Sequence, residues 1–106
     1  MNIDIKKSKN LIQIIFIDDD RIDTTNLKEI QELLTPFVIE IQTSDIKNLE
    51  LDFDSINFID SSGLAMIINI YKKLLKKDQI LSIVNSGSFI QDIFKVTKLD
   101  TFINIR

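Results

Sequence analysis

Two periodicities alternate in the middle of this chain, and they constrain its fold more than any other feature. Residues 49–53 alternate apolar and polar side chains, as on a strand with one buried face. Residues 64–77 follow helical spacing, with an apolar stripe of Leu64, Ile67, Ile68, Tyr71, Leu74 and Leu75. Residues 80–84 form a short apolar run that we expect to be a strand buried on both faces. Strands that alternate with helices in this way indicate an α/β sheet.

The flanking segments extend this pattern at both ends. Residues 3–5 and 11–17 predict two strands that form a hairpin around a polar turn. A helix is predicted from Leu27 to Leu34, with Pro36 marking its end. The alternation over residues 37–41 then predicts a strand, and Asp18–Asp23 an acidic loop.

The last quarter of the chain predicts one more helix and a final strand. Ser88 and Gln91 fit a capping box for a helix ending near Lys98, and residues 102–105 read as a strand. At 106 residues, the chain is long enough for one core. We therefore expect a single α/β domain over residues 1–106, with a mixed sheet, an N-terminal hairpin and about three helices.

Composition excludes several classes of function. A net charge of −3 argues against nucleic acid as a partner. The absence of Cys and His removes the usual zinc ligands, thiol chemistry and the usual general base, so we expect no metal, cofactor or catalytic residue. No apolar run reaches the roughly 20 residues of a membrane span, and the N-terminus lacks the apolar core of a signal peptide. We expect a cytoplasmic protein.

The segment from Asn57 to Leu64 (Asn-Phe-Ile-Asp-Ser-Ser-Gly-Leu) ends a predicted strand and opens the central helix. One interpretation is structural, because Asp and Ser are favoured helix caps and Gly63 permits a tight entry turn. The other is functional, because free N–H groups and the helix dipole make a helix N-terminus an anion site. A phosphoryl group on Ser61 would sit on that site without disrupting the fold. The residues alone leave both interpretations open.

Residues 59–64 (Ile-Asp-Ser-Ser-Gly-Leu) resemble the signature of STAS domains, and more specifically of their anti-sigma-factor antagonist branch. Arg21-Ile22-Asp23 is similar to that family's entry to its first helix. Residues 80–85 and 93–99, followed by Phe102, resemble its last strand, helix and strand. The resemblance covers nearly the whole chain.

The resemblance implies a phosphorylation switch at Ser61. This residue matches the serine that an anti-sigma-factor serine kinase phosphorylates with ATP and magnesium. The unphosphorylated form of such proteins binds the kinase and so releases the sigma factor, and a metal-dependent serine phosphatase reverses the modification. Asp23 and Asp60 match acidic residues that line the phosphorylation site, with Ser62 and Gly63 beside them. For Asp23, a role as a helix cap remains equally open.

Two surfaces are candidates for partner binding. Ala65, Met66 and Asn69 lie opposite the predicted apolar stripe, so we expect Met66 to be exposed and to contact a partner. Many relatives carry a further helix after the last strand, so we also expect apolar surface near Phe102 and Ile105. A second copy of the chain or the partner would cover it, unless the longer stretch 36–48 does so.

The departures from the family pattern concern three glycine positions. Asp20, Asp78 and Lys98 stand where relatives carry glycine. Aspartate tolerates a positive φ better than most residues do, and lysine tolerates it less well.

Three other functions fit parts of the sequence. Residues 14–20 resemble the first strand and acidic pocket of response-regulator receivers, with Asp52 as the phosphorylated residue, but the Met-Pro and Lys-Pro motifs of that family are missing. A hydrolase is disfavoured because Ser61 has no histidine to deprotonate it. The stronger alternative is a STAS interaction subunit of a stress-signalling scaffold or of a lipid-transport complex.

Overall fold

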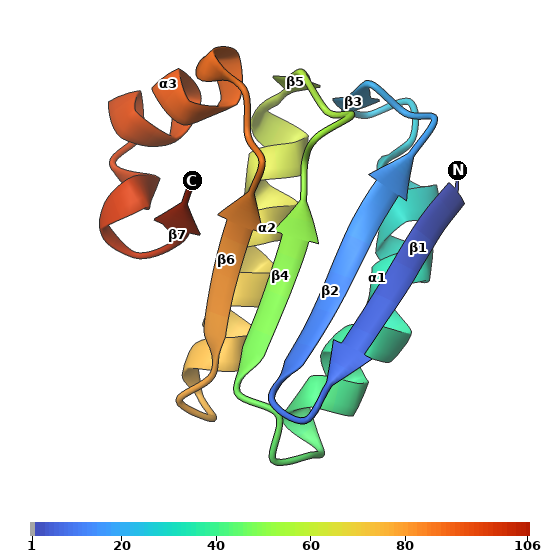
Figure 1. Ribbon diagram of the computed structural model, residues 1–106. Coiled ribbons are helices and arrows are strands. Elements are labelled where there is room, and N and C mark those ends of the chain that lie inside the picture. Colours follow the sequence, from blue (N-terminus) through green and yellow to red (C-terminus); the bar gives the residue numbers. More distant parts are fainter. Residues whose placement is uncertain (1) are drawn as a thin grey trace.

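The computed structural model describes residues 2–106 as a twisted sheet with helices packed behind it (Figure 1). Its elements, in chain order, are β1 (Asn2–Ser8), β2 (Leu11–Ile17), β3 (Arg21–Ile22), α1 (Leu27–Gln42), β4 (Asn48–Asp52), β5 (Phe58–Ile59), α2 (Ser61–Leu75), β6 (Ile80–Val84), α3 (Ser88–Val96), a 3₁₀ turn η1 (Leu99–Thr101) and β7 (Asn104–Ile105).

The main sheet has the strand order β1-β2-β4-β6-β7. The hairpin of β1 and β2 is antiparallel, and every other pair in this sheet is parallel. The predicted mixed sheet with an N-terminal hairpin is therefore confirmed. Because β2, β4 and β6 run in one direction, with Ile15, Asp52 and Val84 in register, their carboxyl ends share one edge of the sheet.

The core lies between this sheet and the two long helices. Figure 1 shows α1 and α2 side by side behind the sheet, with its front face bare. The bare face carries polar contacts across neighbouring strands. The Gln13 amide donates to Glu50 at 3.1 Å, and Glu50 also accepts from Arg106 at 3.1 Å. Along β2, buried residues alternate with partly exposed ones, as on a strand with one buried and one open face.

A second, two-stranded parallel sheet of β3 and β5 lies beyond the carboxyl edge of the main sheet. Ile22 pairs with Ile59 on its buried side, and Arg21 pairs with Phe58 on its exposed side. The Asp60 N–H donates to the Ile22 carbonyl at 3.2 Å and the Asn57 N–H to the Asp20 carbonyl at 2.9 Å. This small sheet sets the position from which α2 begins.

The predicted end of the first helix at Pro36 and the strand over residues 37–41 are wrong. Helix α1 runs through Pro36 to Gln42 and buries Ile30, Leu34, Val38 and Ile41 on one face. The spacing of these buried residues is helical. A strand would place Ile39 on the same face as Ile41, but Ile39 is 53% exposed. Packing of the continuous stripe outweighs the backbone bond that proline removes.

The buried face of α2 is rotated relative to the predicted stripe. Helix α2 buries Gly63, Met66, Ile67, Ile70 and Leu74, whereas Leu75 is 53% exposed. The prediction that Met66 is exposed is therefore wrong, since only 4% of this residue is accessible. Apolar residues lie on both sides of this helix, so periodicity alone did not decide which side faces the sheet.

Smaller corrections concern strand β6 and helix α3. Ile80 is 46% exposed, and only the other four residues of β6 are buried on both faces, as predicted. The capping box at Ser88 is also wrong. Gly87 occupies the N-cap without a side-chain hydrogen bond, and Gln91 donates from its N–H to the Gly87 carbonyl at 3.0 Å.

Three residues stand where the sequence comparison with the family pattern expects glycine, and two of them adopt a positive φ. Asp78 has φ 55° and Lys98 has φ 61°, whereas Asp20 does not, and the left-handed residue of that loop is Asp18 with φ 73°. Lysine at φ 61° is a locally strained choice, because its side chain gains no local hydrogen bond there. No helix within residues 2–106 has the length and apolar character needed to cross a membrane.

Candidate functional site

The candidate site lies at the junction between β5 and α2, at the carboxyl edge of the parallel strands. Parallel sheets commonly bind their ligands at this edge. Asp60 has an extended backbone and serves as the N-cap of α2. One Asp60 carboxylate oxygen accepts from the Gly63 N–H at 2.9 Å, and the Asp60 carbonyl accepts from the Leu64 N–H at 3.0 Å. The predicted cap is confirmed.

Ser61 is the first residue of α2 and is exposed. Within residues 2–106, no hydrogen bond engages the backbone N–H of Ser61 or Ser62. These two donors lie at the positive end of a helix of 15 residues. The arrangement can accept negative charge on the Ser61 oxygen, because neither a buried group nor an existing bond must be displaced.

Gly63 permits a close contact rather than a special turn. Its φ is not positive, so the predicted tight entry turn is not what requires glycine here. A Cβ at this position would lie 2.6 Å from Ile59 Cγ1 and 2.9 Å from Ile22 Cγ2. The absent side chain therefore lets the first turn of α2 rest directly on the β3–β5 sheet, which fixes the position of Ser61.

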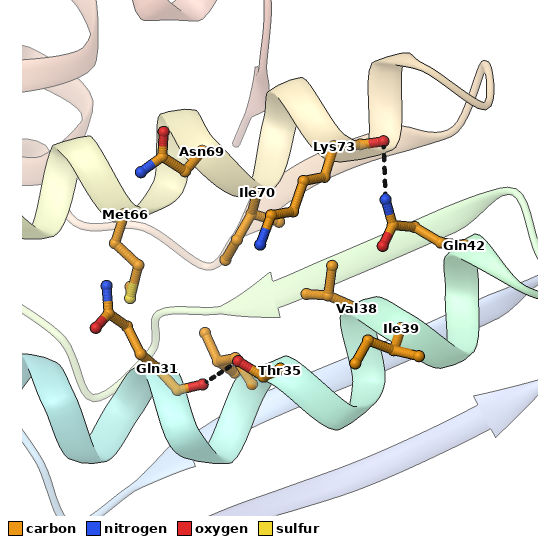
Figure 2. A pocket seen from close by; sticks show the side chains of 10 residues that line it. Gln31, Thr35, Val38, Ile39, Gln42, Met66, Asn69, Ile70 and Lys73 are labelled. Carbon is orange, nitrogen blue, oxygen red and sulfur yellow. Dashed lines mark hydrogen bonds between the residues drawn. The ribbon is translucent and has the colours of Figure 1, made fainter.

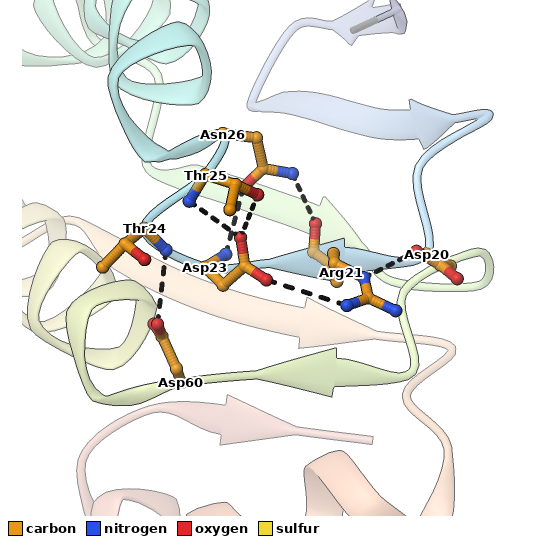
Figure 3. A network of polar contacts seen from close by, with 7 residues as sticks. All are labelled: Asp20, Arg21, Asp23, Thr24, Thr25, Asn26 and Asp60. Carbon is orange, nitrogen blue, oxygen red and sulfur yellow. Dashed lines mark hydrogen bonds and ion pairs between the residues drawn. The ribbon is translucent and has the colours of Figure 1, made fainter.

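Asp23 belongs to a turn that precedes α1 and reaches the site through Thr24 (Figure 3). Its carboxylate accepts from the Thr25 N–H at 2.9 Å and from the Thr25 hydroxyl. The backbone N–H of Thr24, the residue between Asp23 and Thr25, donates to Asp60 Oδ2 at 3.3 Å. Asp23 and Asp60 thus belong to one network of polar contacts. The N-cap of α1 is Asn26 rather than Asp23.

The pKa of Asp23 is held below its ordinary value. The main cause is the hydrogen bond from the Thr25 hydroxyl, followed by the bond from the Thr25 N–H and the positive charge of Arg21. The nearest atoms of the Arg21–Asp23 ion pair are 3.9 Å apart, and Arg21 also pairs with Asp20 at 3.2 Å. Asp23 is therefore an ionised neighbour of the Ser61 site.

Sequence reasoning missed the threonines and the asparagine of this network. Thr24, Thr25 and Asn26 follow Asp23 directly, and the Asn26 side chain bonds both to the Asp23 N–H and to the Arg21 carbonyl. An Asp followed by two threonines is a signal for an Asx turn, which could have indicated this arrangement.

Of the three predicted partner-contact residues, two are exposed. Ala65 and Asn69 are accessible on α2, whereas the side chain of Met66 points into a groove between α1 and α2 (Figure 2). The groove has a volume of about 330 Å³ and a floor of apolar side chains, with Gln31 and Lys73 among the residues that line it. Met66 is part of the packing between the helices.

The apolar surface predicted near the last strand is present. Phe102 is 65% exposed and packs against Tyr71 with ring centroids 6.2 Å apart. Phe102 borders an apolar groove of about 380 Å³ between η1 and one side of α2, the side that the predicted stripe places in the core. The groove is lined by Ile68, Tyr71, Lys72, Leu75, Leu99, Phe102 and Ile103.

The receiver-like pocket does not form. Asp52 is buried, and its two carboxylate oxygens accept from the Asn85 side chain and the Asp54 N–H, each at 2.9 Å. Within residues 2–106, no three acidic side chains converge in a way that could hold a metal ion. Asp52 instead ties the ends of β4 and β6 together.

Comparison with known proteins identifies one family and several relatives with related names. The STAS domain family model matches residues 2–106. The anti-sigma-B factor antagonist of Bacillus subtilis is 25% identical over 105 residues, which cover 99% of this chain and 90% of that protein. The anti-sigma-B factor antagonist of Staphylococcus aureus is 23% identical over 84 residues, which cover 79% of this chain and 74% of that protein.

Several solved structures share this fold. An anti-sigma factor antagonist from Mycobacterium paratuberculosis superposes with a TM-score of 0.80 at 17% identity, covering 98% of this chain and 83% of that one. The anti-sigma factor antagonist SpoIIAA in its unphosphorylated form superposes with a TM-score of 0.74 at 12% identity, covering 99% and 88%. SpoIIAA in its phosphorylated form gives 0.69 at 12% identity, covering 99% and 91%. The chain belongs to the STAS domain family and resembles its anti-sigma-factor antagonists.

Proposed function

We propose that this protein is an anti-sigma-factor antagonist whose partner binding is switched by phosphorylation of Ser61. In the unphosphorylated form it binds an anti-sigma-factor serine kinase, and the sigma factor is released. The kinase transfers phosphate from magnesium-ATP to Ser61, and a metal-dependent serine phosphatase removes it. The support comes from the antagonists of B. subtilis and S. aureus and from SpoIIAA, a relative solved with and without phosphate.

The single observation that carries the proposal is the position of the Ser61 hydroxyl. It is exposed on the first turn of α2, beside two backbone N–H groups without partners among residues 2–106. A phosphate adds about −1.5 to −2 charges and three strong acceptors. The helix dipole and the free donors favour that charge. The fold therefore tolerates phosphorylation, and its effect falls on the interface.

The sign of the switch follows from charge and desolvation. Asp60 precedes Ser61 directly, and Asp23 lies within the same hydrogen-bonded network. Their carboxylates repel a phosphate and direct it outward, toward a bound partner. In a packed interface an unpaired phosphate must lose its water, at a cost of several kcal/mol. Since 1.4 kcal/mol is already tenfold in affinity, binding falls by orders of magnitude.

Recovery of the partner from extract of the native organism is the first test. The Ser61→Ala protein is immobilised and incubated with extract, with and without magnesium-ATP, and bound proteins are identified by mass spectrometry. The proposal expects a serine kinase of the histidine-kinase-like ATPase fold, retained because this variant accepts no phosphate. Recovery of a transport ATPase or of a stress-signalling scaffold in its place would contradict the sigma-factor role.

Mapping the phosphate is the second test. The purified kinase and magnesium-ATP are incubated with the wild-type chain, with Ser61→Ala and with the matched control Ser62→Ala. We expect one phosphate on the wild type and on Ser62→Ala, and none on Ser61→Ala. Phosphate located on Ser62 by peptide mass spectrometry, or on neither serine, would contradict the assignment.

A further inference from the structure

Two phenylalanines form an exposed aromatic pair close to the phosphorylatable serine. Phe58 of β5 is 38% exposed and Phe89 of α3 is 43% exposed. Their rings stack with centroids 5.7 Å apart and an angle of 21° between the planes. The two phenylalanines are 31 positions apart in the sequence, so the geometry of the pair is set by the tertiary fold.

The small β3–β5 sheet holds Phe58 in place. The register pairs Phe58 with Arg21 on the exposed side, while Ile59 and Ile22 are buried beneath them. The Arg21 guanidinium lies 6.0 Å from the centroid of the Phe58 ring, and its ion pairs with Asp20 and Asp23 restrain it (Figure 3). Arg21, Phe58 and Phe89 thus make a preformed surface, which we call the aromatic patch.

The aromatic patch lies close enough to Ser61 to fall within the footprint of a partner centred there. Ser61 is three residues after Phe58, and a chain spans at most about 3.6 Å per residue, so their Cα atoms are at most about 11 Å apart. A standard protein interface covers about 800 Å² on each partner, which corresponds to a disc of about 16 Å radius. A partner centred on the Ser61 hydroxyl therefore reaches the aromatic patch.

The residues of the aromatic patch are of the types that anchor interfaces. Aromatic side chains and arginine carry a large share of binding energy, and a pair already held in place loses little side-chain entropy on binding. On the α1 side of the site, Thr24, whose N–H donates to Asp60, and Thr25 are exposed and polar, and they offer no comparable apolar surface.

Charge around the aromatic patch indicates the chemistry of its partner. Beside Arg21, the loop of residues 18–23 carries four aspartates, Asp18, Asp19, Asp20 and Asp23. A matching surface has an apolar pocket for the rings and a basic rim that faces this loop. Attraction between the basic rim and the acidic loop speeds association of the two proteins. A phosphate on Ser61 lies within the packed region, where it must be desolvated, and so weakens the complex.

We infer that the aromatic patch is the anchor by which the serine kinase holds this protein while it acts on Ser61. The inference rests on the proposed function and names the surface that recognises the partner. It replaces the buried Met66 as the apolar contact and places recognition on the side of Ser61 formed by β5 and α3.

The test compares alanine truncations of exposed apolar side chains. Phe58→Ala and Phe89→Ala each remove one ring of the aromatic patch. Ile80→Ala removes a side chain that is 46% exposed at the first residue of β6, at the sheet edge opposite the Ser61 site, and serves as the control. The dissociation constant of each unphosphorylated variant for the purified kinase that phosphorylates Ser61 is measured by calorimetry with ADP present. Circular dichroism and thermal melting verify that each variant is folded.

We expect Phe58→Ala and Phe89→Ala each to weaken binding by about 30-fold or more, the range of an anchor residue, and Ile80→Ala to change it by less than about threefold. Wild-type affinity in both patch variants would overturn the inference while leaving phosphorylation of Ser61 intact. If Phe58→Ala does not fold, Phe89→Ala decides alone, because its side chain lies on the first turn of α3 and not in the β3–β5 sheet. Failure of any kinase to modify wild-type Ser61 would instead contradict the proposed function itself.

Discussion

Gly63 determines how closely α2 approaches the β3–β5 sheet. The nearest atom to an added Cβ would be Ile59 Cγ1 at 2.6 Å, and the Ile22 carbonyl oxygen would lie 3.0 Å away. Side chain and backbone would both have to move, and overpacking of this kind costs about 1–3 kcal/mol. We expect Gly63→Ala to lower the free energy of unfolding by this amount in urea titrations. Gly87→Ala, where a Cβ meets nothing within 4 Å, is the matched control, and equal stability of the two variants would contradict the account.

Asp23 gives a second prediction at the scale of single residues. Its pKa lies below the ordinary value in the folded chain, chiefly through the Thr25 hydroxyl. A depressed carboxyl pKa stabilises the fold above the unfolded-state pKa, and this contribution is lost as pH falls through the folded-state pKa. In a carbon-13 NMR titration, Asp23 should therefore titrate at lower pH than an ordinary aspartate. Thr25→Val should raise the midpoint, and an unchanged midpoint would show that the hydroxyl is not the main cause.

Helix α1 shows where prediction from sequence failed among the elements. The N-terminal hairpin and the central helix follow from their periodicities, and β6 follows from its short apolar run. Residues 37–41 fit both a strand and the last turns of a helix, and Pro36 favoured the wrong choice. The site was predictable in part: Asp60 and Ser61 follow from the motif, whereas the aromatic pair of Phe58 and Phe89 depends on contacts between distant segments.

Pro36 should therefore be a source of instability within α1. It is exposed, lies in the interior of the helix and cannot donate a backbone hydrogen bond. Replacement by alanine restores a donor, although it also increases the freedom of the unfolded chain. We expect Pro36→Ala to raise the free energy of unfolding by about 1–2 kcal/mol in urea titrations. A loss of stability would show that the proline ring contributes packing that its exposure does not suggest.

At the scale of the whole molecule, the apolar groove around Phe102 is a second surface separate from the Ser61 site. Exposed apolar area of this kind is typical of surfaces that bind a partner. The expectation that a second copy covers it predicts a sedimentation coefficient that rises with protein concentration. A strict monomer at every concentration would remove the dimer. Affinities for the kinase are best measured at concentrations where sedimentation shows one species.

The central claim is that phosphate on Ser61 changes the interface and leaves the fold intact. The most direct measurement compares chain phosphorylated on Ser61 with unmodified chain, in affinity for the purified kinase and in backbone NMR spectrum. We predict a dissociation constant at least about 100-fold higher for the phosphorylated chain, since about 3 kcal/mol of desolvation corresponds to more than two powers of ten. We also predict amide shifts confined to the first turn of α2 and the Asp23 network. Equal affinity of the two forms, or spectral changes throughout the sheet, would contradict the account.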